Sequence, residues 1–107
     1  MDYIVICITC ADKKEAYNIA NTLLKEKLVA CGNIVTGISS IYWWKNRIER
    51  SKEVLLTAKT IKTRFSKIVK RVKELHSYDV PEIIALPVIC GSKDYLNWID
   101  DSVKMPR

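Results

Sequence analysis

Four cysteines and one histidine are the side chains of this chain that are best suited to metal or redox chemistry. Cys7 and Cys10 have Cys-x-x-Cys spacing, but residues three apart in a continuous strand point to opposite faces. They could share a zinc ion or form a redox pair only if the strand ends between them, and no second Cys-x-x-Cys supplies further ligands. We therefore expect four free thiols, with Cys31 and Cys90 in the core or at a sheet edge.

His76 is the only histidine, and it follows an expected helix, close in sequence to Tyr78. A histidine at this place can simply interact with the last carbonyls of its helix. It could also be a metal ligand or a proton carrier, because imidazole changes charge near neutral pH. One histidine cannot make a metal site, so other ligands would be needed: Cys31, Glu53, Glu82 or groups from another subunit.

Signatures of common enzymes are missing from the sequence. It contains no glycine-rich phosphate loop, no Gly-x-Ser-x-Gly and no His-Glu-x-x-His. We expect a protein that is not an enzyme, and an enzyme that uses His76 as an acid or base is only the third hypothesis.

Length and charge narrow the class of protein further. The 107 residues fit a single domain, 1–107, and we expect a cytoplasmic protein because no apolar run could span a membrane and no secretory signal is visible. The net charge of +6 comes from residues 45–73, which hold eleven basic and two acidic side chains. These basic residues alternate with apolar ones at helical spacing, so a solvated helix face explains them and we do not expect nucleic-acid binding.

Hydrophobic periodicity predicts an ordered series of strands and helices. The β-branched run 3–9 fits a central strand that is buried on both faces. Asp12 and Glu15 have the spacing of a capping box, and they begin a helix that runs to about Lys27. The first third of the chain is therefore expected to form a strand followed by an amphipathic helix.

A long β-hairpin is expected in the middle of the chain. An extended segment at 29–35, where Gly32 indicates a bulge or a close backbone approach, leads into two β-branched and aromatic runs within 38–60. The polar break at 45–47 separates these runs, and Asn46 tolerates the left-handed conformation of a tight turn. Arms of this length are expected to overhang a small domain.

The tip of this hairpin predicts self-association. Trp43 and Trp44 are neighbours in a strand and must point to opposite faces, so one of them needs a second surface. An aromatic strand that overhangs its domain can pair with another copy of the chain. The expected interface residues are Tyr42, Trp43, Trp44 and Ile48.

The second half of the chain predicts a helix at 61–75, a strand at 82–90 and a short last helix that begins after Gly91-Ser92. Pro87 cannot donate to a ladder, so its strand is expected at an edge or with a bulge. The packing residues expected in the last helix are Tyr95, Leu96, Trp98 and Ile99. The order β-α-β-β-α-β plus a C-terminal helix is that of an α+β, ferredoxin-like split βαβ fold, with an antiparallel sheet and two helices on one face.

A set of short motifs spread over almost the whole chain resembles the CutA family of divalent-cation tolerance proteins. The motifs are Leu28-Val-Ala-Cys31, Ser40-Ile-Tyr-Trp-Trp44, Glu53, Lys59-Thr60, Leu75-His76-x-Tyr78-x-x-Pro81-Glu82-Ile83, Leu86-Pro87 and Tyr95-Leu96-x-Trp98-Ile99. The resemblance implies a ferredoxin-like homotrimer, assembled by strand pairing of the hairpin. It also implies metal tolerance, with copper or another divalent metal bound weakly and no obligatory cofactor.

The resemblance further implies a cleft between subunits, lined by Trp44, Glu53, Lys59, His76 and Tyr78. The candidate metal ligands are His76 and Cys31. The sequence departs from copper-binding members, in which two histidines are adjacent and a cysteine occupies the first strand, because Leu75 precedes His76 here and Ile8 stands at the cysteine position. The alternative function is a small-molecule sensor or signalling trimer, whose anionic ligand is held by Lys59 and His76 in the cleft.

Overall fold

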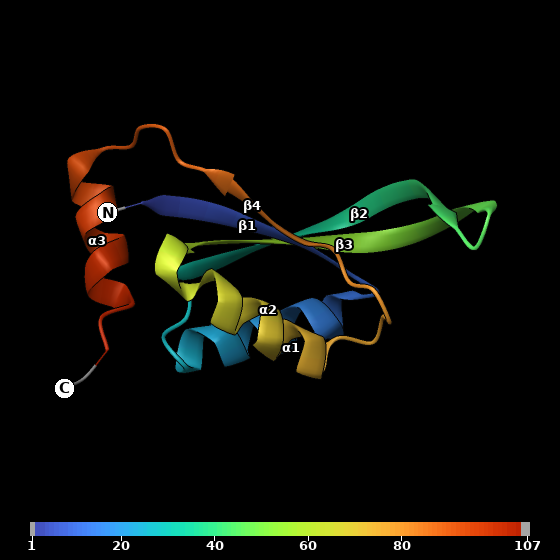
Figure 1. Ribbon diagram of the computed structural model, residues 1–107, viewed down its shortest axis with the longest axis horizontal. Helices are drawn as coiled ribbons and strands as arrows, with labels where there is room; N and C mark the ends of the chain where they lie inside the picture. Colours follow the sequence, from blue (N-terminus) through green and yellow to red (C-terminus); the bar gives the residue numbers. More distant parts are fainter. Residues whose placement is uncertain (1, 106–107) are drawn as a thin grey trace.

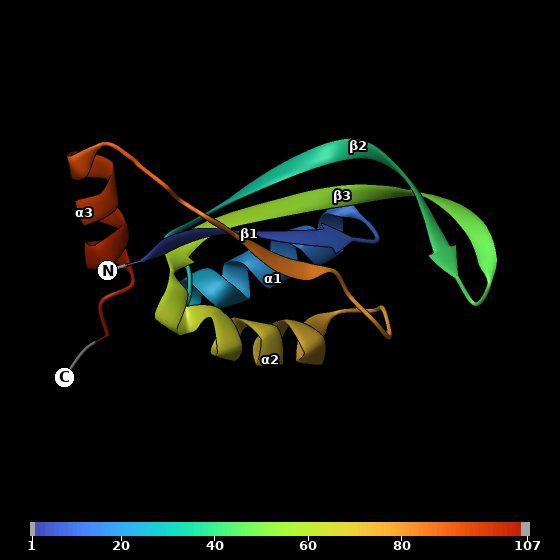
Figure 2. The same cartoon turned by 45° about the horizontal axis from the view of Figure 1, so that its top comes forward.

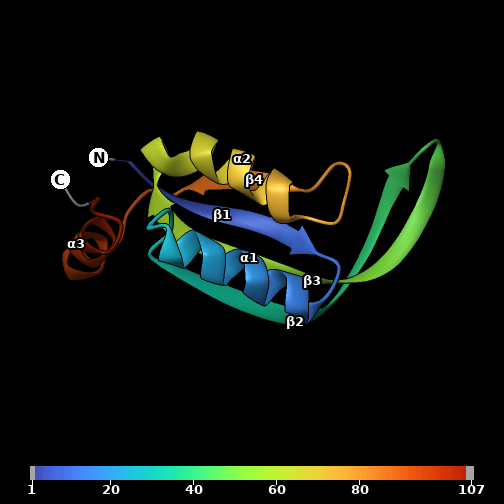
Figure 3. The same cartoon turned by 90° about the horizontal axis from the view of Figure 1, so that it is seen from below.

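Four antiparallel strands form one sheet, two helices cover one face of it, and a third helix lies at one end (Figure 1, Figure 3). The computed structural model describes residues 2–105. The strand order is β2-β3-β1-β4. The elements are β1 (Tyr3–Cys10), α1 (Lys13–Lys25), β2 (Cys31–Trp44), β3 (Arg47–Ile61), a 3-10 turn (Lys62–Arg64), α2 (Phe65–Leu75), β4 (Ile83–Pro87) and α3 (Lys93–Ser102). This order confirms the predicted split βαβ fold with an added C-terminal helix.

β1 is a central strand, as expected, but only one of its faces is buried. Ile4, Ile6, Ile8 and Cys10 are buried on the helix side, whereas the alternate residues from Tyr3 to Thr9 stay partly exposed. The prediction of a strand buried on both faces is therefore wrong for the single chain. The reason is that α1 and α2 both lie on the same side of the sheet and leave the other side, here called the open face, uncovered (Figure 1).

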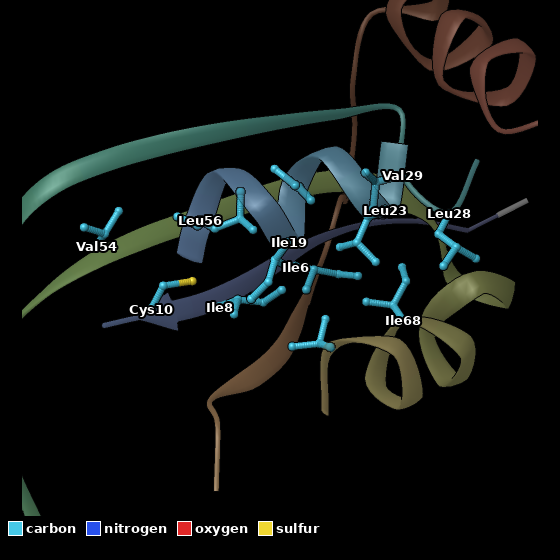
Figure 4. Close-up of a cluster of buried hydrophobic side chains, with 14 of the residues drawn as sticks. Ile6, Ile8, Cys10, Ile19, Leu23, Leu28, Val29, Val54, Leu56 and Ile68 are labelled. Carbon is cyan, nitrogen blue, oxygen red and sulfur yellow. The ribbon is translucent and has the colours of Figure 1, made fainter. Parts of the chain in front are cut away.

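The main core fills the space between the sheet and these two helices (Figure 4). Ile6 and Ile8 of β1 and Leu56 of β3 meet Ile19 and Leu23 of α1, and all five are fully buried. Burial of side chains of this size stabilises a fold by about 1.5–3 kcal/mol each. This layer is the rigid base from which the hairpin and the loop after α2 project.

Both caps of α1 follow from its sequence. The Asp12 side chain accepts a hydrogen bond from the Glu15 backbone N–H at 2.8 Å, which confirms the predicted N-cap. At the other end Lys27 takes a left-handed conformation (φ 56°), and the Leu28 N–H reaches the Leu23 carbonyl at 2.9 Å. These are the features of a Schellman motif, which ends the helix at Lys25, two residues before the expected position.

The hairpin of β2 and β3 extends beyond the rest of the chain and curves away from it (Figure 1, Figure 2). Lys45 and Asn46 both have positive φ angles, of 50° and 64°, as a two-residue type I′ turn requires. β2 is one strand, and its bulge lies between Val35 and Ile38 rather than at Gly32. Gly32 instead allows a close approach, because a Cβ there would lie 3.3 Å from the Leu56 side chain.

The C-terminal part of the sheet is shorter than predicted. β4 is an edge strand, as Pro87 indicates, but it ends at that residue. Cys90 therefore lies in an exposed loop, and its expected place in the core or at a sheet edge is wrong. The other three cysteines lie in strands, and all four thiols are free, as predicted.

Helix α3 begins at the predicted Ser92 cap, whose hydroxyl accepts from the Tyr95 N–H at 3.4 Å. Of its expected packing residues only Ile99 is fully buried, and Val103 joins it in a second small cluster. Tyr95 and Trp98 are about two-fifths exposed and lie against each other with ring centroids 5.4 Å apart. The spacing of the aromatic residues predicted the helix correctly, but fewer of its side chains are buried than this spacing led us to expect.

Candidate functional site

His76 is buried at the junction of α2 and β1. Its side chain is 0% exposed, and Nε2 lies 2.8 Å from the carbonyl oxygen of Thr9. Nδ1 accepts a hydrogen bond from the Tyr78 backbone N–H at 3.1 Å, so Nε2 carries the proton and donates to Thr9. The prediction that His76 interacts with the last carbonyls of its own helix is wrong, because its imidazole bonds a carbonyl of the neighbouring strand.

Two further donor side chains lie beside this imidazole. Cys10, at the end of β1, and Glu15, in the first turn of α1, each place a ligand atom within 4.8 Å of the others and of His76. Burial, followed by the nearby carboxylates, raises the pKa of Cys10 to about 12. We name Cys10, Glu15 and His76 the thiol–imidazole cluster.

Glu15 also joins three segments of the chain. Its carboxylate accepts from the Ala11 N–H at 3.0 Å and from the Ser77 N–H at 2.9 Å, and it lies 3.7 Å from Nδ1 of His76. Burial alone would raise the pKa of Glu15, but the hydrogen bonds from Ala11 and Ser77 and the neighbouring His76 hold that pKa below its ordinary value. The carboxylate therefore fastens the loop after α2 to the start of α1.

Glu15→Gln is expected to lower the free energy of unfolding by about 1–2 kcal/mol at pH 7, because the hydrogen bonds from the Ala11 and Ser77 N–H groups lose their charged acceptor. Because folding lowers the pKa of Glu15, the ionised carboxylate stabilises the native state at pH values above about 4.3, the pKa of glutamate in the unfolded chain. This stabilisation is lost as the pH falls below that value. The difference between wild type and variant is therefore expected to shrink towards pH 3. Urea unfolding at pH 7 and pH 3 measures it, with Glu74→Gln on the exposed face of α2 as a control that changes stability by less than about 0.5 kcal/mol. An equal loss at both pH values would contradict the role of the charge.

A pocket of about 720 Å³ opens beside this cluster, between the outer part of the hairpin and the segment after α2. Its aromatic walls are Tyr42, Trp43, Trp44 and Tyr78, and its carboxylates are Glu53, Asp79 and Glu82. We name it the acidic aromatic pocket. Strand register places Tyr42, Trp44 and Glu53 on one face of the hairpin, and it places Trp43 and Ile48, which pair directly, on the other.

Glu53 is the most buried polar residue of this pocket. It is 7% exposed, and its Oε2 accepts a hydrogen bond from the Tyr78 hydroxyl at 2.8 Å. Burial and then this hydrogen bond raise the pKa of Tyr78 above its ordinary value, so the phenol stays a donor at neutral pH. The rings of Tyr78 and His76 lie 4.7 Å apart, which connects the pocket to the thiol–imidazole cluster.

Comparison with known proteins identifies the family of this chain. The model of the family described as CutA1 divalent ion tolerance protein matches residues 4–102. The chain belongs to the CutA1 family. It is 44% identical over 98 residues to the divalent-cation tolerance protein CutA of Thermus thermophilus, covering 92% of this chain and 95% of that protein. It is 41% identical over 101 residues to the chloroplastic protein CutA 1 of rice (Oryza sativa subsp. japonica), covering 94% of this chain but 57% of the rice protein.

Solved CutA1 structures have the same fold. The crystal structure of CutA1 from Oryza sativa superposes with a TM-score of 0.94 at 39% identity, covering 99% of this chain and 97% of that one. The CutA of Archaeoglobus fulgidus, described as a periplasmic divalent cation tolerance protein, gives 0.93 at 40% identity, with coverage of 95% and 99%. These relatives are thus described as proteins of different compartments. In the part of this chain that the structure describes, no helix is long and apolar enough to cross a membrane.

Two residues that the CutA1 resemblance assigned to the site lie elsewhere within one chain. Lys59 pairs with Val5 and Cys31 in the sheet register, on the open face, and its ammonium donates to the Asn33 side chain. His76 contacts β1 at the carbonyl of Thr9, which lies four residues beyond Val5. Four residues of a strand correspond to a distance of about 13 Å. The intersubunit cleft that joins Lys59 to the other residues stays a prediction.

The predicted metal ligands His76 and Cys31 are likewise far apart in one CutA1 subunit. Cys31 lies at the start of β2, and its Sγ is 3.6 Å from the Tyr95 hydroxyl of α3. Sequence reasoning missed Cys10 and Glu15 as neighbours of His76. The capping box did place Glu15 just after the strand that ends with Cys10, but nothing in the sequence showed that the end of α2 returns to this point.

Proposed function

We propose that this chain is the subunit of a cytoplasmic homotrimer that binds divalent metal ions, copper among them, weakly and without catalysing a reaction. Membership of a divalent-ion tolerance family supports a role in metal tolerance. The four free thiols fit a reducing compartment. One structural observation carries the metal part of the proposal, namely the thiol–imidazole cluster.

The donor set of this cluster suits a borderline or soft divalent metal. Thiolate, imidazole and carboxylate are the ligand types that zinc and copper use in proteins. Two ligands that bind one ion at about 2.0–2.3 Å lie at most about 4.6 Å apart, and the donors of Cys10, Glu15 and His76 all lie within 4.8 Å of one another. Side-chain shifts of a few tenths of an ångström would bring them to one ion.

Binding at this place must replace interactions that the free protein already makes. The metal has to displace the proton of Cys10, whose pKa is about 12, and the Tyr78 N–H that occupies Nδ1 of His76. It must also share the Glu15 carboxylate with two backbone N–H groups. These costs explain why we propose weak binding rather than a permanent structural ion.

Calorimetric titration with Cu²⁺ and Zn²⁺ tests the metal site. All proteins carry Cys90→Ser, because an exposed thiol binds metal on its own. We expect saturable heat for this parent, and affinity at least tenfold lower for Cys10→Ala and for His76→Gln, since each loses one of three ligands. Cys7→Ala is the matched control, because Cys7 lies on the same strand and points to the opposite face.

Two results would contradict the metal site. The first is the absence of saturable heat with either metal. The second is an unchanged affinity in both ligand variants, which would place the metal elsewhere, with Cys31→Ala then the next variant to titrate.

The trimer part of the proposal rests on the surface that one chain leaves uncovered. At the hairpin end Ile41 is 64% exposed, Trp43 72% and Ile48 54%. On the open face of the sheet Val35, Ile84 and Leu86 are also about half exposed. Apolar surface of this extent on a small domain is typical of an interface with another chain.

The alternative function, a sensor of an anionic ligand held by Lys59 and His76, has less support. These two side chains lie apart within one chain, on different sides of the sheet. The acidic aromatic pocket contains three carboxylates, which repel an anion.

A further inference from the structure

We infer that the segment 77–82, which joins α2 to β4, is released from its resting position when a metal ion binds to the thiol–imidazole cluster. We call 77–82 the connecting segment. The inference concerns the regulation of the proposed metal site and therefore rests on the proposed function. It is carried by the hydrogen bonds that hold this segment and by the single lone pair of one histidine nitrogen.

The connecting segment is held by side chains rather than by secondary structure. Within residues 2–105 its backbone forms no hydrogen bond with another backbone group. Three bonds to side chains hold it instead. The Ser77 N–H donates to the Glu15 carboxylate at 2.9 Å, and the Tyr78 N–H donates to Nδ1 of His76 at 3.1 Å. The Tyr78 hydroxyl donates to Glu53 at 2.8 Å. Two of the three bonds therefore end on the thiol–imidazole cluster.

His76 can offer its Nδ1 to a metal ion or to the connecting segment, but not to both. Its Nε2 donates to the Thr9 carbonyl at 2.8 Å, an arrangement that orients an imidazole whose other nitrogen binds a metal. Nδ1 lies on the side of the cluster, 3.7 Å from a carboxylate oxygen of Glu15. A neutral imidazole has one lone pair at this nitrogen, so Nδ1 must give up the Tyr78 N–H when it coordinates.

Glu15 loosens the connecting segment further. Its Oε1 accepts from the Ala11 N–H and faces His76, and its Oε2 accepts from the Ser77 N–H. A carboxylate that shares its charge with a cation is a weaker acceptor, so the bond from Ser77 loses strength. The remaining bond, from the Tyr78 hydroxyl, offsets little of the conformational entropy that an ordered loop has lost.

Release of the connecting segment turns a buried event into a change at the surface. The three donors of the cluster are buried or partly buried, whereas the segment carries Asp79, which is exposed, and Val80, which is 70% exposed. All the contacts described lie within one chain, so each subunit of the proposed trimer carries its own switch. A surface that differs between the free and the metal-bound state is what another molecule needs in order to respond to metal.

Amide hydrogen exchange followed by NMR tests this inference on the assembled Cys90→Ser protein, with and without saturating Zn²⁺. We expect the amide protons of Ser77 and Tyr78 to exchange at least tenfold faster with zinc. The Leu28 amide, which is bonded to the Leu23 carbonyl at the end of α1, is expected to keep its exchange rate. The nitrogen chemical shift of His76 Nδ1 reports independently whether zinc is bound.

Tyr78→Phe provides a second measurement, because coupling between two events acts in both directions. The variant removes a hydrogen bond that only the resting position makes, so we expect zinc to bind about 3- to 10-fold more tightly. A residue that merely supported the metal site would lower the affinity when changed. Tyr17→Phe on α1 is the matched control, since it removes a hydroxyl from a half-exposed ring away from the cluster, and its affinity is expected to be unchanged.

The possible failures can be told apart. An unchanged exchange rate of the Tyr78 amide in protein whose His76 signal shows bound zinc would overturn the inference and leave the metal site standing. So would an affinity for zinc that is equal or lower in Tyr78→Phe. If zinc does not bind at all, the metal site fails and the inference fails with it. The exchange measurement needs no change at Tyr78, so it decides the question even if Tyr78→Phe does not fold.

Discussion

Replacing Trp43 and Trp44 together with alanine is expected to convert the proposed trimer into monomers or aggregates and to lower its melting temperature. Trp43 is 72% exposed in the single chain and pairs across the hairpin with Ile48, which is 54% exposed. Burial of a tryptophan-sized side chain contributes about 2–3 kcal/mol, and a threefold ring repeats this contribution at every interface. Sedimentation equilibrium at micromolar concentration measures the result, with a wild-type mass of three 12.3 kDa chains expected.

Single substitutions and a control refine this experiment. Trp43 is 72% exposed and Trp44 40%, and they lie on opposite faces of the hairpin, so Trp43→Ala is expected to weaken association more than Trp44→Ala. Tyr17→Ala on α1 removes a half-exposed aromatic side chain on the helix side and is expected to leave the trimer intact. A wild-type mass of one chain would refute the trimer. A trimer that survives the double substitution would leave backbone pairing of the edge strand β2 as the basis of assembly.

The features that the sequence predicted correctly depend on residues close together in the chain. Asp12 and Glu15 form their cap because three residues of helix bring one to the other. Asn46 takes the left-handed turn because its side chain tolerates this conformation, and Trp43 and Trp44 face opposite ways because they are adjacent in a strand. In each case the backbone geometry alone decides the outcome.

The features that were missed depend on contacts between distant segments. Whether β1 was covered on one face or two could not follow from its own residues, because both helices cross the same side of the sheet. Gly32 was expected to mark a bulge or a close backbone approach, and it serves the close approach. The bulge occurs beside Gly37, where φ is 77°, since a glycine serves equally well for close packing and for a positive φ.

The candidate site shows the same division. The segment from His76 to Tyr78 was predicted as part of the site from the sequence, but its partners Thr9 and Glu15 come from β1 and α1. These contacts join residues that are 62 and 67 positions apart in sequence, and no local pattern indicates that they meet. Burial of Glu53 beside Tyr78 is likewise a consequence of the tertiary fold and could not be read from residue types alone.

Leu56→Ala is expected to lower the free energy of unfolding by about 2–5 kcal/mol, whereas Leu55→Ala is expected to act mainly on assembly. Leu56 is fully buried in the core beneath α1, so its loss leaves a cavity that the packed helices cannot fill. Denaturant unfolding gives this loss, while the mass of the folded protein is expected to stay that of a trimer.

Leu55 is the matched control, because it is the same side chain one residue earlier on β3 and points to the open face, opposite Thr9 and Val35. It is only partly buried in the single chain, so its loss leaves no sealed cavity there. If other subunits cover the open face, Leu55→Ala raises the protein concentration needed for assembly in sedimentation experiments. A Leu55→Ala variant that assembles as the wild type does, with unchanged stability, would show that the open face stays in water and that the hairpin alone holds the subunits together.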